Sequence, residues 1–506
     1  MRRLVCLGAA LVVAAVAGCH RGPRTGAGEV VVLIEDPPQS LDPRFVGRAY
    51  DVKIGRLITG SLVSVDNPTL EPRPELAERI DRVDPVTYDV TLREGVRFSD
   101  GTPMTAEDVA YTLTSIADPA LGSTLRSMTD RIARTEVRSP RTVRLVLKEP
   151  HAPFITDLDL GVVPRHVVAA RGGRFPDDQV VGAGPFRLAH RDATRIVLAP
   201  NPYYVLGAPK VRLVFKVIRD PNSRLLVLVG GSADLTQNTV PPLLIDAVEQ
   251  RPELRVERGR GAVFTYLVCN TADPALADVR VRRALALAID RERLVRSKLH
   301  GRAALATGLL PTWHWAYSGD VPRWPYDPAR ARALLAEAGV RPKLVYKTSS
   351  DKLRVAIAQV IAHELNAVGF DVEVRAYEFA TLLDDLKKGN FQIATLQLPD
   401  VVEPQLLHRL FHSSQVPRPG AADGHLNRSR FADPALDADL EAGSRELDPA
   451  RRRAVYARAQ ARLAELLPVV PLWHEDNVVI MRRDLRGYEV QPNARLGALA
   501  RAWKAR

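Results

Sequence analysis

Apolar and polar residues follow two different periods along this chain, and together these periods predict a sheet of buried strands covered by helices. Residues 29–35 form an almost continuous apolar run, which is typical of a strand buried on both faces. Further strands are predicted at 87–93, 343–347, 371–377 and 391–398, and helices at 353–368 and 381–388. Gly369 and Gly389 directly follow these two helices and are expected to end them. Strand–helix–strand units of this length predict an α/β fold with a largely parallel sheet.

Several helix starts are marked by side chains that can cap free backbone amides. The tripeptide Asp-Pro-Ala begins at Asp327, Asp433 and Asp448, each time before a helical pattern. Aspartate can accept hydrogen bonds from the first turn, and proline suits the first helical position. Thr105 with Asp108 three residues later predicts another helix start, since the carboxylate lies near the positive end of the helix.

The N-terminus has the pattern of an export signal. Two arginines precede an apolar run at residues 4–17, which is shorter than the ~20 residues that a membrane-spanning helix needs. The run ends in Val16-Ala17-Gly18-Cys19, which resembles the lipobox of bacterial lipoproteins. We therefore expect a lipoprotein signal peptide at 1–18, a lipid anchor on Cys19 and a polar tether at 19–28. The alternative is an ordinary signal peptide with an incidental cysteine.

The distribution of charge and the small number of cysteines argue against nucleic-acid binding and against a disulfide within the chain. The net charge is +12, but the 71 basic residues are spread along the chain and form no clustered tail. A solvated basic surface beside anionic lipid is therefore favoured over nucleic-acid binding. Of the three cysteines, Cys6 leaves with the signal and Cys19 is the expected anchor. Cys269 then has no disulfide partner within the chain, and its apolar neighbours predict a buried thiol.

No familiar catalytic motif is present. The sequence lacks Gly-x-Ser-x-Gly, a P-loop, a dinucleotide-binding glycine motif and His-Glu-x-x-His, so we expect no enzyme, no cofactor and no metal. His408 and His412 are four residues apart and could hold zinc or nickel, but an ordinary polar helix face is favoured. Trp313-His314-Trp315 could stack on a ligand or pack as a loop between domains, and the sequence leaves both open.

Taken in order, several segments resemble the extracytoplasmic solute-binding proteins of ABC importers, in the peptide- and nickel-binding family 5. The resemblance extends over roughly residues 30 to 480. Its blocks are Leu-Asp-Pro at 41–43, then residues 92–109, 182–186, 201–204, 270–271, 278–291, 327–339 and 467–472. Most of these blocks are caps, turns and core faces, so they identify the fold better than the ligand.

The resemblance implies a class II periplasmic-binding-protein-like fold, with two hinged α/β lobes and an extra subdomain inserted in the first. The expected parts are lobe I at 29–265 with the inserted subdomain at about 45–180, lobe II at 266–480, and a C-terminal return to lobe I at 481–506. In open α/β sheets the ligand lies in a crevice near strand ends, and closure around it is a hinge motion.

The resemblance also suggests ligand contacts. Residues 389–404 are similar to the stretch in which the family's oligopeptide binders hold the peptide amino group, and Asp400 falls at the position of the binding aspartate. This chain departs from the family three residues earlier, where Gln397 replaces a frequent tryptophan. Asp400 could otherwise be a turn residue beside Pro399.

Other candidate contacts come from separate parts of the chain. Arg48 and Ala49 belong to a loop resembling one that lines the family's cleft, and Tyr266 matches a ligand-contacting tyrosine or a core residue. Ser350 and Lys352 open a helix after a strand, which favours an anion such as a peptide carboxylate or a plain helix cap. Trp313 and Trp315 complete the set of candidate ligand-binding residues.

The predicted function follows from the resemblance. We expect a monomeric, lipid-anchored extracytoplasmic receptor that captures a solute, most favourably a peptide, and delivers it to a membrane permease and its ATPase. A metal chelate or a glycoside is the alternative solute. An exported hydrolase or a sensor with the same fold are alternatives from other classes.

Overall fold

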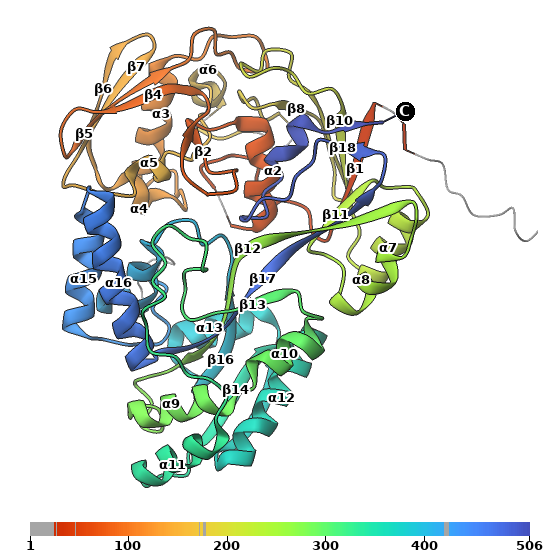
Figure 1. Ribbon diagram of the computed structural model, residues 1–506. Coiled ribbons are helices and arrows are strands. Elements are labelled where there is room, and N and C mark those ends of the chain that lie inside the picture. The colour runs from red at the N-terminus through yellow and green to blue at the C-terminus, as the bar shows by residue number, and fades with distance from the viewer. Residues whose placement is uncertain are drawn as a thin grey trace, which may run out of the picture.

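The computed structural model describes residues 25–505 except 27, 46, 172, 176–178 and 419–424 (Figure 1). An 11-stranded mixed sheet runs through the whole molecule in the order β15-β14-β16-β12-β17-β11-β1-β10-β9-β8, with β13 paired to β17. The strands at one end are β15 (Asp371–Tyr377), β14 (Lys343–Ser349) and β16 (Ile393–Leu398). Those at the other end are β11 (Leu235–Gln237), β1 (Glu29–Ile34), β10 (Arg212–Val217), β9 (Arg195–Pro200) and β8 (Phe186–Arg191).

Two long strands connect the ends of this sheet. β12 (Leu254–Cys269) and β17 (Val469–Arg482) are antiparallel and cross between the upper and lower parts of Figure 1. The short strand β13 (Ala303–Leu305) pairs with the middle of β17. We call the part around β1 the first lobe and the part around β14 the second lobe. The expected boundaries at 265/266 and 480/481 fall inside β12 and β17, so each strand belongs to both lobes.

A second sheet forms an additional unit of the first lobe. Its order is β4 (Ala77–Arg82), β5 (Thr87–Leu92), β7 (Thr142–Leu147) and β6 (Ile132–Ser139). Helix α3 (Ala106–Ala117) covers this sheet, and a separate apolar core lies between them. The N-terminus of α3 is confirmed, because a capping box joins Thr105 and Asp108. In Figure 1 this unit lies next to helices α15 and α16 of the second lobe.

Locally encoded helix signals are confirmed elsewhere. Asp327, Asp433 and Asp448 each accept a backbone hydrogen bond at the start of α11 (Pro328–Ala338), α15 (Pro434–Arg445) and α16 (Pro449–Leu466). Helices α12 (Lys352–Val368) and α13 (Phe379–Lys388) end at Gly369 and Gly389, both with left-handed backbone angles. Glycine adopts this conformation at little steric cost, which is why it ends both helices.

The remaining elements are shorter or lie at the periphery. The helices are α2 (Ala49–Thr59), α4 (Arg126–Thr129), α5 (Phe154–Asp157), α6 (Arg165–Val168), α7 (Pro221–Val229), α8 (Pro242–Glu249), α9 (Val279–Ala288), α10 (Arg291–Lys298) and α14 (Leu406–Phe411). Single 3₁₀ turns lie at Ala169–Arg171, Ser413–Gln415 and Gly497–Arg501. Two-stranded pairs are formed by β2 (Val63–Ser64) with β3 (Arg73–Pro74) and by β18 (Leu485–Arg486) with β19 (Trp503–Lys504).

Cys269 lies at the end of β12 in the core of the second lobe. Its side chain is fully buried, as predicted, and burial raises the pKa of the thiol to about 12. The thiolate is therefore scarce at neutral pH, and this cysteine is unreactive in the folded protein. Among the described residues, no helix has both the length and the apolar character needed to cross a membrane.

Candidate functional site

The directions of the strands place the carboxyl ends of strands from both lobes at one crevice. β16 is antiparallel to β12, so its carboxyl end points toward the first lobe. β1 is parallel to β11, which is antiparallel to β17, so the carboxyl end of β1 points toward the second lobe. Asp400, which follows β16, and Glu35, which follows β1, therefore lie at the place where open α/β sheets leave a ligand crevice.

Asp400 lies in a strained turn at the edge of this crevice. Its φ angle is 60°, and the next backbone amide, that of Val401, donates a hydrogen bond to the carbonyl of Ala262 on β12. One carboxylate oxygen, Oδ2, accepts a hydrogen bond from Nη2 of Arg495 at 3.0 Å. The other oxygen, Oδ1, is buried and has no hydrogen-bond partner among the described residues. A buried carboxylate oxygen without a partner is costly, so this atom is suited to a donor from outside the chain.

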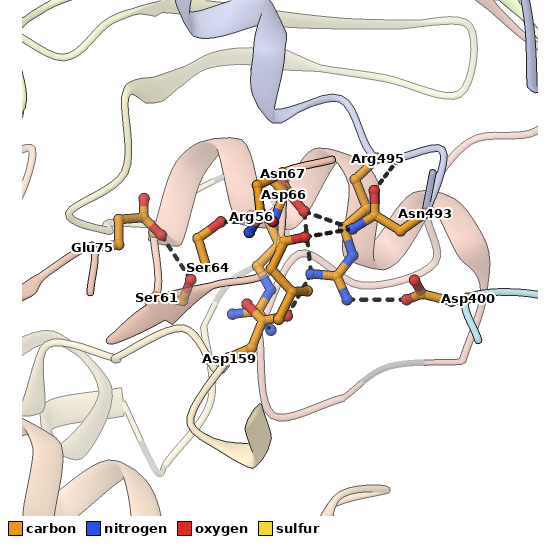
Figure 2. Close-up of polar contacts among 12 residues, drawn as sticks. Arg56, Ser61, Ser64, Asp66, Asn67, Glu75, Asp159, Asp400, Asn493 and Arg495 are labelled. Atoms are coloured by element: carbon orange, nitrogen blue, oxygen red, sulfur yellow. Dashed lines mark hydrogen bonds and ion pairs between the residues drawn. The ribbon is translucent and has the colours of Figure 1, made fainter. Parts of the chain in front are cut away.

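Arg495 reaches Asp400 from the first lobe and joins it to two further carboxylates (Figure 2). Nη1 of Arg495 contacts Asp159 and lies 3.5 Å from Oδ1 of Asp66. Arg56 on α2 adds a second guanidinium, with Nη2 3.2 Å from Oδ1 of Asp159. We call these five residues, Arg56, Asp66, Asp159, Asp400 and Arg495, the Arg495 cluster. Only Asp400 in this cluster comes from the second lobe.

Burial and charge set the ionisation of the cluster. Burial alone would raise the pKa of Asp159, but the guanidinium groups of Arg495 and Arg56 outweigh it and hold the pKa below its usual range. Burial dominates at Asp66 and raises its pKa. Arg495 keeps its charge, because the three carboxylates outweigh the effect of burial and raise its pKa. Asp159 and Arg495 thus form the fixed ion pair of the cluster.

The first-lobe side of the crevice carries a second set of charges near Glu35 and Lys53. Burial raises the pKa of Glu35 and lowers the pKa of Lys53 on α2, and the two groups stabilise each other electrostatically. Arg224 lies 4.0 Å from Glu35. The crevice therefore has charged groups of both signs on the first-lobe side, and a ligand with both an ammonium and a carboxylate would find partners there.

A cavity of about 490 Å³ lies behind the Arg495 cluster in the first lobe. Arg56, Asp66, Asp159 and Arg495 line it on the crevice side. On another wall, Glu75 accepts hydrogen bonds from Ser61 at 2.8 Å and from Tyr204 at 3.0 Å. Burial raises the pKa of Glu75 to about 7. Sequence reasoning missed Glu75, Arg495 and Asp159, because residues from many separate segments meet at this cavity and no local motif connects them.

Gln397 and the residues of helix α12 lie on the second-lobe side. The Gln397 amide donates to Oγ1 of Thr265 at 3.1 Å and to Oε1 of Glu475 at 2.8 Å. Glu475 also pairs with Arg354 of α12 at 3.1 Å. Ser350 and Lys352 are exposed, and Asp351 between them caps the helix. Since β14 and β16 are parallel, Ser350 and Asp400 leave the sheet at the same edge.

The remaining candidates lie apart from Asp400 in the chain and differ in burial. Arg48 and Ala49 are exposed at the start of α2. Tyr266 is buried and stacks on Phe264 with ring centroids 4.9 Å apart, within the second-lobe core. Trp313 and Trp315 are half-buried beneath arginines, Arg260 at 5.6 Å and Arg452 at 5.3 Å from the respective ring centroids. Their roles as ligand contacts stay predictions.

His408 and His412 stack on each other on α14 and at its C-cap. Their ring centroids are 4.3 Å apart, and burial followed by the neighbouring imidazole lowers the pKa of His408 to about 4. Nε2 of His412 lies 3.4 Å from Glu441. Within the described part of the chain, no group of three or more histidine, cysteine, aspartate or glutamate side chains is arranged to hold a metal ion.

Comparison with known proteins identifies the family. The sequence profile of the bacterial extracellular solute-binding proteins, family 5, matches residues 71–415. The chain belongs to this family. It is 31% identical to Protein XP55 of Streptomyces lividans, over 94% of this chain and 88% of that protein. It is 28% identical to di/tripeptide-binding protein 2 of Pseudomonas aeruginosa (strain UCBPP-PA14), over 95% of both chains.

The fold agrees with solved structures of this family. NikZ from Campylobacter jejuni, solved in complex with Ni(L-His), superimposes with a TM-score of 0.84 at 22% identity, over 95% of this chain and all of NikZ. The expected two-lobed α/β fold is thereby confirmed. The chain is an extracellular solute-binding protein. The sequence blocks that resembled family 5 therefore indicated the correct family.

Proposed function

We propose that this protein captures peptides in the crevice between its lobes and delivers them to an ABC permease and its ATPase. Two observations support a peptide. A relative that aligns over 95% of both chains is a di/tripeptide-binding protein. The position expected to hold a peptide ammonium, Asp400, presents a buried carboxylate oxygen without a partner among the described residues. The latter observation carries the proposal.

The chemistry of Asp400 suits an ammonium group. A peptide ammonium has three donors and a full positive charge, so it would supply both the hydrogen bond that Oδ1 lacks and charge compensation for the carboxylate. A neutral amide would supply the hydrogen bond alone. On the facing first-lobe wall, Lys53 would contact the peptide carboxylate, and the half-exposed Glu35 would accept hydrogen bonds from the peptide backbone. Arg48, Ala49, Gln397, Ser350 and Lys352 remain proposed contacts at the rim.

We further propose that Cys19 anchors the mature protein in a membrane and that it acts there as a monomer. Cys19 lies outside the described residues, so this part of the proposal rests on the sequence alone. Family membership supports the location, because the family consists of extracellular solute-binding proteins.

Replacing Asp400 tests the peptide assignment. Asp400→Asn keeps the shape of the side chain and removes its charge, which leaves a bound ammonium without a counterion. Removing one partner of such a pair costs ~3 kcal/mol or more, so affinity for a free-amine tripeptide should fall about a hundredfold or more. An N-acetylated tripeptide should bind the wild type weakly and respond little to the substitution. Calorimetry with both proteins and both ligands measures this cycle.

A matched control is the exposed aspartate Asp320, whose change to asparagine should leave both affinities unaltered. If Asp400→Asn binds the free-amine tripeptide as tightly as the wild type, Asp400 is a turn residue and the peptide assignment loses its residue-level support.

A further inference from the structure

The interaction between Arg495 and Asp400 occupies the position proposed for the ligand ammonium. We propose that Arg495 is an internal competitor: it bridges the two lobes through Asp400 before a ligand arrives, and it withdraws onto Asp159 and Asp66 when a ligand ammonium takes Asp400. The bridge itself is independent of the ligand's identity. The exchange with a peptide ammonium rests on the proposed function.

The two partners of the bridge are not equally dependent on it. Arg495 has Asp159 and Asp66 as alternative carboxylates, both in the first lobe. Asp400 has Arg495 as its only ion-pair partner among the described residues. Arg495 therefore remains compensated if it releases Asp400, whereas Asp400 requires another cation. This asymmetry makes Arg495 the displaceable partner.

The backbone around Arg495 is held in the first lobe. Its amide donates to Oδ1 of Asn493 at 3.2 Å, and Nδ2 of Asn493 donates to Oδ1 of Asp66 at 3.0 Å. The side chain is nearly buried, and its Nε has no hydrogen-bond partner among the described residues. Nη1 already contacts Asp159 and lies 3.5 Å from Oδ1 of Asp66, so the guanidinium stays paired within the first lobe when it releases Asp400.

The competition has consequences for affinity and selectivity. A ligand binds only the fraction of molecules in which Asp400 is free, so its apparent dissociation constant equals the intrinsic constant divided by that fraction. A ligand without a positive charge would lose the Arg495–Asp400 interaction and gain no ion pair in return. Arg495 would therefore discriminate against uncharged ligands, as a repulsive element adds selectivity beyond the attractive contacts.

The affinity test removes Arg495 without leaving excess charge. Arg495→Gln alone would leave Asp66 and Asp159 facing each other with Arg56, so the variant carries Asp66→Asn as well. The double variant Arg495→Gln/Asp66→Asn should bind a free-amine tripeptide about tenfold more tightly than the wild type. Asp66→Asn alone removes one of the carboxylates that receive Arg495, so it should bind no more tightly than the wild type. An unchanged or weaker affinity of the double variant would refute the competition.

The bridge test needs no ligand. Cysteines are introduced at the exposed residues Lys210 of the first lobe and Val340 of the second, with Cys6→Ala and Cys19→Ser so that only these thiols react. In the unliganded protein, the distance between the two spin labels should become longer with Asp400→Asn. It should become longer by the same amount with Arg495→Gln/Asp66→Asn. A protein that carries all three substitutions should show no further increase in this distance. Identical distances in all of these proteins would refute the bridge.

The two tests separate this inference from the peptide assignment. If tripeptides do not bind but the distances lengthen, the bridge is supported and the ligand class is wrong. If Asp400→Asn abolishes tripeptide binding while Arg495→Gln/Asp66→Asn changes neither affinity nor distance, the peptide assignment is supported and the inference fails.

Discussion

Glu75 is the buried acid whose ionisation should be visible in the stability of the whole protein. Burial raises its pKa from the ordinary value of 4.5 to about 7. Between these two values the folded protein holds a proton that the unfolded chain has lost. The contribution of Glu75 to stability must therefore fall as the pH rises from about 4.5 to about 7, because at this residue the folded state binds more protons across this window.

Glu75→Gln should remove this pH dependence. Glutamine resembles the protonated acid and can keep partners in Ser61 and Tyr204. The variant should unfold with about the same free energy as the wild type at pH 4.5 and should be more stable at pH 8, by up to about 3 kcal/mol. Urea unfolding at both pH values measures this difference. The exposed Glu94→Gln serves as a control, and wild-type and Glu75→Gln curves that stay parallel in pH would contradict the prediction.

Asp400 and Arg495 show which residues of the candidate site can be predicted from the sequence and which cannot. Asp400 was singled out from the sequence as a candidate because it follows a strand in a stretch that resembles a known binding segment. Arg495 was not found, because its partners are 95, 336 and 429 residues away in the chain. Burial and pairing of this kind are properties of the folded arrangement, and arginine is otherwise common and mostly solvated in this sequence.

At the scale of elements, the signals that proved correct are local. Aspartate caps, glycine stops and the alternation of Tyr88, Val90 and Leu92 depend on neighbours within a few residues, and each is confirmed in the structure. The full length of β12 and β17 was not predicted. Each strand changes partners along its length, so its burial pattern is the sum of two environments and follows no single period.

A bulge in β12 is one of two places where the two crossing strands depart from regular pairing. Gly259 pairs with Asn477 and Val263 with Glu475, so three residues of β12 face one of β17. At Gly261 a Cβ atom would lie 1.8 Å from the carbonyl oxygen of Glu475. Glycine is required here by the close approach of the two backbones.

Gly261→Ala should therefore destabilise the connection between the lobes. The added methyl group forces the strands apart, and overpacking of this kind costs about 1–3 kcal/mol, which lowers the melting temperature by several degrees. Gly308→Ala is the matched control, because a Cβ atom at that position meets no atom within 4 Å. Calorimetric melting of both variants gives the comparison. Equal melting temperatures would show that the bulge tolerates a side chain.

At the scale of the whole molecule, His300 and Arg302 of the second lobe pair with Asp246 of the first, and two further contacts between the lobes bear on their motion. One is the nearly buried contact of Arg495 with Asp400. The other is the edge of the inserted unit, where the amide of Ala152 donates to the carbonyl of Ser444 at 2.8 Å and Arg445 pairs with Glu149 at 3.3 Å. The Glu149–Arg445 pair is exposed and screened by solvent, so it contributes little energy. A hinge motion about β12 and β17 would separate both contacts together.

The two-lobed shape would need an attachment that leaves the crevice free, and the sequence offers one at Cys19. Acylation at two points of one residue gives stable membrane binding, whereas a single chain gives only marginal binding. Cys19→Ser should therefore release the protein from the membrane fraction, either as a soluble exported form or as an unprocessed precursor. Fractionation of cells expressing each form, with mass spectrometry of the N-terminal peptide, measures the outcome.

The control for this experiment is Cys6→Ala, which changes a cysteine within the expected signal and should leave both processing and membrane attachment intact. A precursor that keeps its signal would stay at the membrane through that signal, so the mass of the N-terminal peptide decides how the fractionation is interpreted. A fully processed Cys19→Ser protein has neither signal nor acyl chain. If such a protein still fractionates with membranes, the attachment arises from the folded part of the chain and Cys19 is not the anchor.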